Sequence, residues 1–453
     1  MKFKMIAQGV VFSCFLLVVG NCVLAQSKIS SPVDTLSMEE CITIALKNKS
    51  DVGIARDQMH SAEILKQSAR GNLFPSVSIS ASGSHNEQGV GKRFFSGVEF
   101  TAPATERNYY RTGLSLNQPL FTGGQLYHGL KLADYNYTQS EVDYQGVRER
   151  ITQEVASAYL DVLRARQLVE VYEKTLESSE AQVELVEERY NLGAVAKSDL
   201  YKAQTRAGND RINLLQQKHV LDMRRRTLNV TMGRNPVTSI HLPEFDYTAP
   251  VIPARDGAKN RATKLNKDLR SLELGVQKAK ANLAVARANL LPSVSAFFSY
   301  DRTGFRMKEI YSPLDKNWSY AYGLSLSIPV FQNLNHRTAV RQREAELSIN
   351  QRRLQDARLQ VEMHVENLIQ QLETYQEVIE LNQLNLQSAE EDLRLARERY
   401  NLGEATILDV LDAQAAVTNA RRILVYAKFD ARNTEVRLQR VLGTLLESGK
   451  PQL

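Results

Sequence analysis

The hexapeptide ERYNLG occupies Glu188–Gly193 and occurs again at Glu398–Gly403, 210 residues further along the chain. The segment GLSL of Gly113–Leu116 recurs at Gly323–Leu326 with the same offset. Self-similarity at a fixed offset identifies a repeated structural unit. We therefore interpret the 453-residue chain as one unit of about 200 residues that is present twice.

The offset changes at one place in the repeat. Pro75–Ser78 matches Pro292–Ser295 at an offset of 217, whereas Pro119 matches Pro329 at 210, so seven residues are gained or lost between Pro75 and Pro119. Surface loops tolerate insertions, whereas a packed helix that loses residues turns its apolar face away from its neighbours. The spacing predicts a loop in the variable stretch and continuously packed helix after it.

The N-terminus has the pattern of a secretory signal peptide at residues 1–25. Lys2 and Lys4 precede the apolar run Val10–Val19, which is too short to cross a bilayer as a helix and is followed by a small-residue cleavage site. An alternative makes Cys22 an acylated N-terminus. After removal of the signal, Cys41 is the only cysteine, so no intramolecular disulfide is expected.

The charge pattern and the motifs argue against nucleic-acid binding and against catalysis. The formal net charge is +6, and basic residues are interspersed with acidic ones instead of clustering. The seven histidines have no metal-ligand spacing, and there is neither a glycine-rich phosphate loop nor a nucleophile elbow. We expect no nucleic-acid partner, no enzymatic activity, no cofactor and no metal.

Two long helical hairpins are predicted by periodicity. Proline is absent from 120–235 and from 330–450, and apolar residues recur at steps of three, four and seven along Gln125–Tyr190. A helix of that length is a rod of about 100 Å. Glycine is the usual residue just past a helix end. We therefore expect helical hairpins at about 124–232 and 333–442, each turning at its Tyr-Asn-Leu-Gly peptide.

Two β-hairpins are predicted at about 76–118 and 293–328, where apolar residues alternate with small polar ones. Alternation of this kind is typical of outer-membrane strands, with lipid on one side and water on the other. No later segment has 18 consecutive apolar residues, so a membrane span would have to be β. Pro75, Pro119, Pro292 and Pro329 are expected to mark the junctions between strand and helix.

Four strands cannot close a barrel, and an open sheet in lipid would leave edge backbone groups unsatisfied. Two copies would give eight strands and a lumen filled by side chains, whereas three copies give twelve. The expected fold class is mainly α with β: duplicated long helical hairpins plus four transmembrane strands per chain. A homotrimer would form a twelve-stranded β-barrel continued by an α-barrel. The expected divisions are a first repeat at 26–234, a proline-bearing linker at 235–256, a second repeat at 257–443 and a tail at 444–453.

The chain resembles the TolC-type outer-membrane efflux proteins, or outer membrane factors. The resemblance rests on the duplicated turn, on Ile407–Ala413, on the opening Leu36–Asn48, and on the strand-end phrases Asn72–Val77 and Gln118–Gly124. It implies a trimeric duct in the lipid of the outer membrane with a periplasmic extension. Substrates would arrive from an inner-membrane pump, of RND or ABC type, through a periplasmic membrane-fusion adaptor. The linker and tail would form an equatorial belt.

The resemblance also implies that the adaptor docks at the hairpin tips. These are Arg189, Tyr190, Asn191, Leu192 and Gly193 in the first copy, and Arg399, Asn401, Leu402 and Gly403 in the second. Two other readings exist: a structural coiled-coil spacer of the envelope explains the rods but not the strands, and a passive porin explains the strands but not the rods. Neither the exported substrate nor the energy source of the pump, proton gradient or ATP, follows from the sequence.

The predicted channel entrance contains two carboxylates three residues apart, Asp409 and Asp412. They share a helix face, and threefold symmetry would place six of them around one mouth, where they would attract cations. Alternatively, Thr406 caps the helix, and the charge of Asp409 in the first turn interacts favourably with the helix dipole without any role in the channel. The resemblance implies that Tyr400 and Asp199 help to hold the entrance closed. The family's arginine for this closure is replaced here by Ala405, which leaves open how the gate is held closed.

Overall fold

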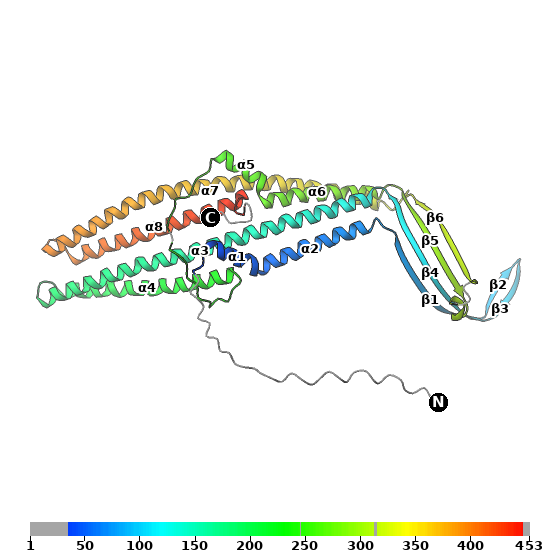
Figure 1. Ribbon diagram of the computed structural model, residues 1–453, viewed down its shortest axis with the longest axis horizontal. Helices are drawn as coiled ribbons and strands as arrows, with labels where there is room; N and C mark the ends of the chain where they lie inside the picture. Colours follow the sequence, from blue (N-terminus) through cyan, green and yellow to red (C-terminus); the bar gives the residue numbers. More distant parts are fainter. Residues whose placement is uncertain (1–34, 245, 312–314, 447–453) are drawn as a thin grey trace, which may run out of the picture.

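The computed structural model describes residues 35–244, 246–311 and 315–446 (Figure 1). The expected signal peptide, Cys22 and residues 447–453 of the tail lie outside the described residues. The first half of the chain consists of α1 (Met38–Asn48), α2 (Ser50–Gly71), β1 (Ser76–Gln88), β2 (Gly91–Phe95), β3 (Val98–Ala102), β4 (Thr105–Thr122), α3 (Gln125–Asn191) and α4 (Lys197–Thr231).

The second half repeats the order of long elements. It consists of α5 (Arg255–Leu265), α6 (Lys267–Ala288), β5 (Ser293–Gly304), the 3₁₀ turn η1 (Met307–Ile310), β6 (Trp318–Ser327), α7 (Asn335–Leu402) and α8 (Ile407–Leu442). Helices α3 and α7 have 67 and 68 residues, which corresponds to about 100 Å each. The predicted pair of long helical hairpins is confirmed.

Four of the strands form an antiparallel sheet in the order β1-β4-β5-β6, at the opposite end of the molecule from the hairpin turns (Figure 1). Strands β1 and β6 are its edges and have no further partner in the described chain. Apolar side chains on both edge strands are exposed, and the exposed fraction of Ile79 reaches 80%. Among the described residues, no helix is both long enough and apolar enough to span a bilayer.

The sequence expectation for Pro119 was wrong. Pro75 and Pro292 stand directly before β1 and β5, and Pro329 follows β6, but Pro119 lies inside β4. The pairing of β4 with β5 shifts register between Pro119 and Phe121. Proline lacks an N–H for the ladder, and within sheets it is tolerated at such bulges. The strand therefore continues to Thr122 instead of ending at the proline.

The stretch of variable length is more ordered than the expected loop. In the first half it holds the two-stranded hairpin of β2 and β3, whose turn residues Ser96 and Gly97 both have positive φ angles. Two-residue turns of this kind match the twist of paired strands. In the second half the same place is taken by the short turn η1. The added residues therefore form an extra hairpin beyond the four-stranded sheet.

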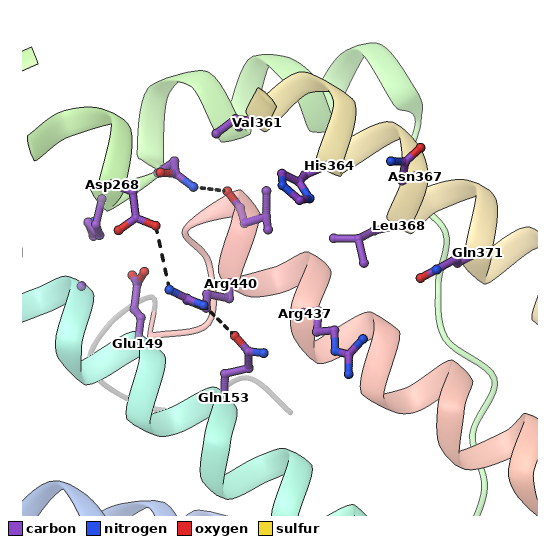
Figure 2. A pocket seen from close by; sticks show the side chains of 14 residues that line it. Glu149, Gln153, Asp268, Val361, His364, Asn367, Leu368, Gln371, Arg437 and Arg440 are labelled. Carbon is purple, nitrogen blue, oxygen red and sulfur yellow. Dashed lines mark hydrogen bonds and ion pairs between the residues drawn. The ribbon is translucent and has the colours of Figure 1, made fainter. Parts of the chain in front are cut away.

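The helices form a layer in which the two hairpins pack side by side, with α3 against α8. The largest apolar cluster lies where α1, α3, α4 and α8 meet, around Ile151, Leu160, Leu228 and Phe429. Helix α8 ends where α6 begins, and Figure 2 shows this junction from close by. Near this junction, helix α5 packs on α7 and α8 through an apolar cluster that includes Ala262, Ile369 and Leu442.

The segment between α4 and α5 crosses the middle of the molecule (Figure 1). It is held by hydrogen bonds to its carbonyl groups. Arg166 Nη1 donates to Leu242 O at 2.8 Å, and Gln376 Nε2 donates to Pro250 O at 3.1 Å. The proline-bearing segment therefore ties the first helical hairpin to the second at mid-height.

Candidate functional site at the hairpin tips

The two copies of the ERYNLG peptide have the same turn geometry. Gly193 and Gly403 have φ angles of 74° and 81°. The amide of Gly193 donates to Tyr190 O at 2.8 Å, and that of Gly403 donates to Tyr400 O at 3.1 Å. A left-handed glycine that satisfies the last carbonyls is a common helix C-cap. Each helix thus ends at its Tyr-Asn-Leu-Gly peptide, as the position of the glycine predicted.

Arg189 joins the tip of the first hairpin to that of the second. Its Nη1 atom donates to Tyr400 O at 2.9 Å, and its Nη2 atom donates to Asn401 Oδ1 at 2.9 Å. The guanidinium also lies over the Tyr400 ring, 4.7 Å from its centroid. The equivalent residue, Arg399, donates at 3.5 Å to Glu404 O of its own turn and to no other group among the described residues. The two copies of the turn therefore make different contacts.

Tyr400 is enclosed although it lies next to the exposed turn. Its exposed fraction is 5%, and it packs against Val186, Leu200 and Ile407. Burial raises the pKa of the Tyr400 hydroxyl, and the charge of Asp199 adds to this increase in pKa. The charge of Arg189, whose guanidinium lies over this ring, opposes the increase in pKa. The structure thus brings Tyr400 near Asp199, which forms an ion pair with Lys202 at 3.0 Å.

Asp409 forms a capping box at the start of α8. Its Oδ2 atom accepts from Thr406 N at 2.7 Å and from Thr406 Oγ1 at 2.8 Å, while Asp409 N donates to Thr406 Oγ1 at 3.4 Å. These hydrogen bonds hold the pKa of the Asp409 carboxyl below its usual value. The capping alternative is thus observed for Asp409. Its charge also lies on the exposed side of the helix.

Asp412 differs from Asp409. It is exposed, and no hydrogen bond or ion pair of Asp412 is found among the described residues. Ala405, at the position where the resemblance implies an arginine, packs at the edge of the apolar cluster around Val410. The carboxylate of Asp412 is therefore free to interact with ions in solution, whereas one oxygen of Asp409 is engaged in the capping box.

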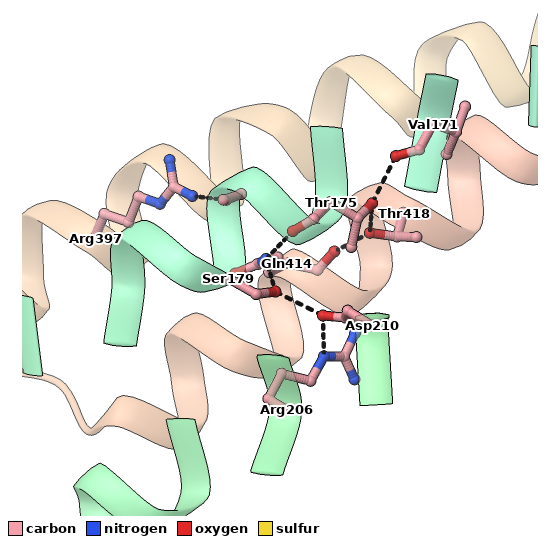
Figure 3. Close-up of polar contacts among 9 residues, drawn as sticks. Val171, Thr175, Ser179, Arg206, Asp210, Arg397, Gln414 and Thr418 are labelled. Atoms are coloured by element: carbon pink, nitrogen blue, oxygen red, sulfur yellow. Dashed lines mark hydrogen bonds and ion pairs between the residues drawn. The ribbon is translucent and has the colours of Figure 1, made fainter. Parts of the chain in front are cut away.

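A buried polar network lies above the tips and was not predicted from the sequence (Figure 3). Ser179 Oγ donates to Asp210 Oδ2 at 2.6 Å and accepts from Gln414 Nε2 at 2.8 Å. Arg206 Nε donates to the same oxygen of Asp210 at 3.2 Å. The network connects α3, α4 and α8. Buried polar groups need their partners, so these bonds fix the register of the three helices.

Comparison with known proteins identifies the family. A family model described as outer membrane efflux protein matches residues 41–234 and 259–444. The chain belongs to this family. The probable efflux pump outer membrane protein TtgC of Pseudomonas putida is 22% identical, with 90% of this chain and 83% of TtgC covered. The outer membrane protein TolC of Escherichia coli is 23% identical, with 84% and 76% covered.

Solved structures show the same fold. The outer membrane protein VceC of Vibrio cholerae matches with a TM-score of 0.79 and 21% identity, covering 90% of this chain and 96% of VceC. The MtrE outer membrane channel of Neisseria gonorrhoeae, in its open state, matches with a TM-score of 0.76 and 19% identity, covering 92% and 91%. The protein is an outer-membrane efflux channel with a periplasmic extension.

Proposed function

We propose that three copies of the chain close into a single duct, which an adaptor connects to an inner-membrane pump. One observation carries the proposal: β1 and β6 are unpaired edges of a sheet whose apolar side chains are exposed. In lipid, each unsatisfied edge N–H or C=O costs several kcal/mol. Pairing of β1 with β6 of a neighbouring copy removes these edges, and three copies give twelve strands, enough for an open lumen.

The helical layer supports the same closure. Helices α4 and α7 are the two outer helices of the layer near the tips. Exposed apolar side chains recur on one face of each; they are Tyr201, Ile212 and Leu215 on α4, and Leu381, Leu384 and Leu395 on α7. Steps of about 3, 7 and 11 residues keep side chains on one helix face. In a ring of copies, the α4 row would pack against the α7 row of the next copy.

Variants of the α7 row test this assembly. With lysine at both Leu381 and Leu384, we expect the purified protein to lose its trimer, because each charge would enter an apolar seam. Val237→Lys is the control, since Val237 is an even more exposed apolar residue but lies in the linker. Light scattering in mild detergent measures the mass. A Leu381 and Leu384 variant that stays as trimeric as the control would contradict packing of α7 on a neighbour.

The tips have the surface expected for adaptor docking. Leu192 and Leu402 lie at the apex of their turns with exposed fractions of 83% and 75%. A groove of about 420 Å³ between α3 and α7 reaches the tip and includes Lys174, Arg397 and Asn401. Exposed apolar residues beside polar grooves are typical of protein interaction sites. Asp409, Asp412, Tyr400 and Asp199 would form the gated entrance enclosed by the docked adaptor.

Crosslinking in intact cells tests docking and identifies the class of pump. We expect the parent protein to capture a periplasmic adaptor and an inner-membrane pump, either proton-driven or ATP-driven. Changing Leu192 and Leu402 to Asp should reduce that capture severalfold, while the trimer remains. Leu359→Asp, at an exposed position on α7 far along the chain from both tips, is the control. Equal adaptor capture by all three proteins would exclude the tips as the docking surface.

A further inference from the structure

A cavity of about 500 Å³ lies where α8 ends and α6 begins, between α3 and α7 (Figure 2). The two helix ends meet end to end. Asn266 Nδ2 donates to Val441 O at 2.9 Å, while Asn266 Oδ1 accepts from Leu269 N at 2.9 Å. The ends are in close contact at Gly443, where a Cβ atom would lie 2.5 Å from Leu265 O. Two helix ends leave space that a continuous helix would fill with side chains.

The cavity has an apolar side and a polar side. Val361, Leu368 and Val441 line it and also pack against the apolar cluster that holds α5. Amide side chains, including Gln153 and Gln371, line its polar part. Small-molecule sites commonly have volumes of about 300–1,000 Å³, with apolar walls and a few polar groups that orient the ligand. The size and lining therefore fit a small organic molecule.

Positive charge dominates the wall of the cavity. Lys267 and Arg437 line it, and neither has a hydrogen bond or ion pair among the described residues. Arg440 donates to Gln153 Oε1 at 3.1 Å and lies 3.9 Å from Asp268. The first residues of α6, a 22-residue helix, also line the cavity. The N-terminus of a helix favours anions. The cations without partners would be satisfied by an anionic group.

Glu149 is the second acid of the cavity, and it is buried. Its exposed fraction is 5%, and no hydrogen bond or ion pair of Glu149 is found among the described residues. Burial raises the pKa of its carboxyl to about 7, against the opposing charges of Lys267, Arg440 and Arg148 and with a small addition from Asp268. The protonated form can donate a hydrogen bond and adds no negative charge.

We propose that this cavity binds small organic anions that have an apolar body, with Lys267 and Arg437 contacting the anionic group. The apolar body would lie against Val361 and Leu368, and the protonated carboxyl of Glu149 would donate a hydrogen bond to the ligand. His364 and Asp268 are the remaining titratable groups of the lining. The proposal rests on the proposed function in one respect. If three copies of the chain form one duct, three such cavities would lie along it.

Calorimetric titration with three probes of one ring system tests the charge preference. The mature protein, held in amphipol at pH 6, is titrated with 2-naphthoate, with neutral 2-naphthamide and with 2-naphthylmethylammonium. We expect 2-naphthoate to bind at least tenfold more tightly than 2-naphthamide, and the ammonium probe to bind most weakly. Equal binding of the three probes, or a preference for the ammonium probe, would overturn the proposal.

Variants locate the binding. Arg437→Gln and, independently, Lys267→Gln should each weaken 2-naphthoate binding at least fivefold and leave 2-naphthamide binding unchanged. Arg422→Gln, on the same helix as Arg437 but bonded only to Asn419, is the control. Glu149→Gln should abolish the loss of 2-naphthoate affinity that the parent shows between pH 6 and pH 8. Arg437 and Lys267 variants that behave like the control would exclude this cavity.

The same samples separate this proposal from the proposed assembly. Light scattering reports the oligomer in each titration cell. A trimer that does not distinguish the probes would refute the anion site and leave the duct intact. Binding of 2-naphthoate by a protein that is not trimeric would support the site and refute the trimeric duct.

Discussion

Arg189→Ala should loosen the contact between the two hairpin tips. The side chain comes from α3 and reaches the last carbonyls of α7, 211 positions further along the chain. It also lies over the Tyr400 ring. Among the described residues, no other side chain of the first turn is hydrogen-bonded to the second turn. The substitution therefore removes the polar link between the tips and leaves both turns and their glycines in place.

The size of the effect follows from the contacts. Hydrogen bonds from a charged donor contribute about 1.5–3 kcal/mol when sheltered, but exposed ionic contacts contribute about 0.2–1 kcal/mol. Arg189 is half-buried at the tip of the molecule, so its two bonds are only partly sheltered from water and we take the lower range for each. The contact with the ring adds about 0.5–1 kcal/mol. The total is about 1–3 kcal/mol per protomer. A change of 1.4 kcal/mol corresponds to about a tenfold change in the equilibrium between joined and separated tips.

Single-channel recording in planar bilayers measures the result. We expect the open probability of the Arg189→Ala channel to rise by about an order of magnitude. Arg189→Lys should give an intermediate value, because lysine keeps the charge over the ring but loses the two-pronged contact. Arg422→Ala is the control, since Arg422 bonds only within its own helix. An open probability for Arg189→Ala equal to that of the control would refute a role of this contact in closure.

Four further predictions concern ion selectivity, helix capping, the turns and pH. Asp412→Asn should remove most of the channel's cation preference in bilayer recordings. Asp409→Asn should lower the melting temperature at neutral pH, and this effect should disappear in acid. The reason is that a carboxyl whose pKa is lowered by folding stabilises the folded protein only at pH values above that pKa. Gly193→Val and Gly403→Val should each cost about 1–3 kcal/mol and reduce adaptor capture in a pull-down, whereas Asn at either site should be tolerated. The parent should lose about 2.5 kcal/mol of unfolding free energy per protomer from pH 5 to pH 8, because Glu149 keeps its proton to about pH 7 when folded. Circular-dichroism melts of Glu149→Gln should lack this dependence on pH.

The long elements of this fold could be predicted because their signals are local and repeated. Proline-free helices and duplicated turns at Gly193 and Gly403 predicted both hairpins, and each glycine has the expected positive φ. Pro119 was misread, because a proline signal cannot distinguish the end of a strand from a bulge within it. The β2–β3 hairpin was not predicted, because the difference in length between the repeats indicates an insertion but not its structure. The Ser96-Gly97 turn was the available signal.

The contacts of the site were less predictable than its location. Asp409 and Thr406 lie three residues apart, so their capping box was visible as a sequence pattern. Arg189 was assigned to the docking surface, but its partners on α7 are distant in sequence and depend on how the hairpins pack. Burial of Glu149 has the same origin, since it depends on the junction of α6 and α8. Contacts between the two repeats can be identified only from the tertiary structure, because they depend on how the helices pack.

Native mass spectrometry of the protein extracted from outer membranes in mild detergent tests the central claim most directly. The unpaired edges β1 and β6 predict a complex of three mature chains. Treatment that unfolds the sheet should release single chains. A complex of one or two chains under the mild conditions would contradict closure of the duct by three copies.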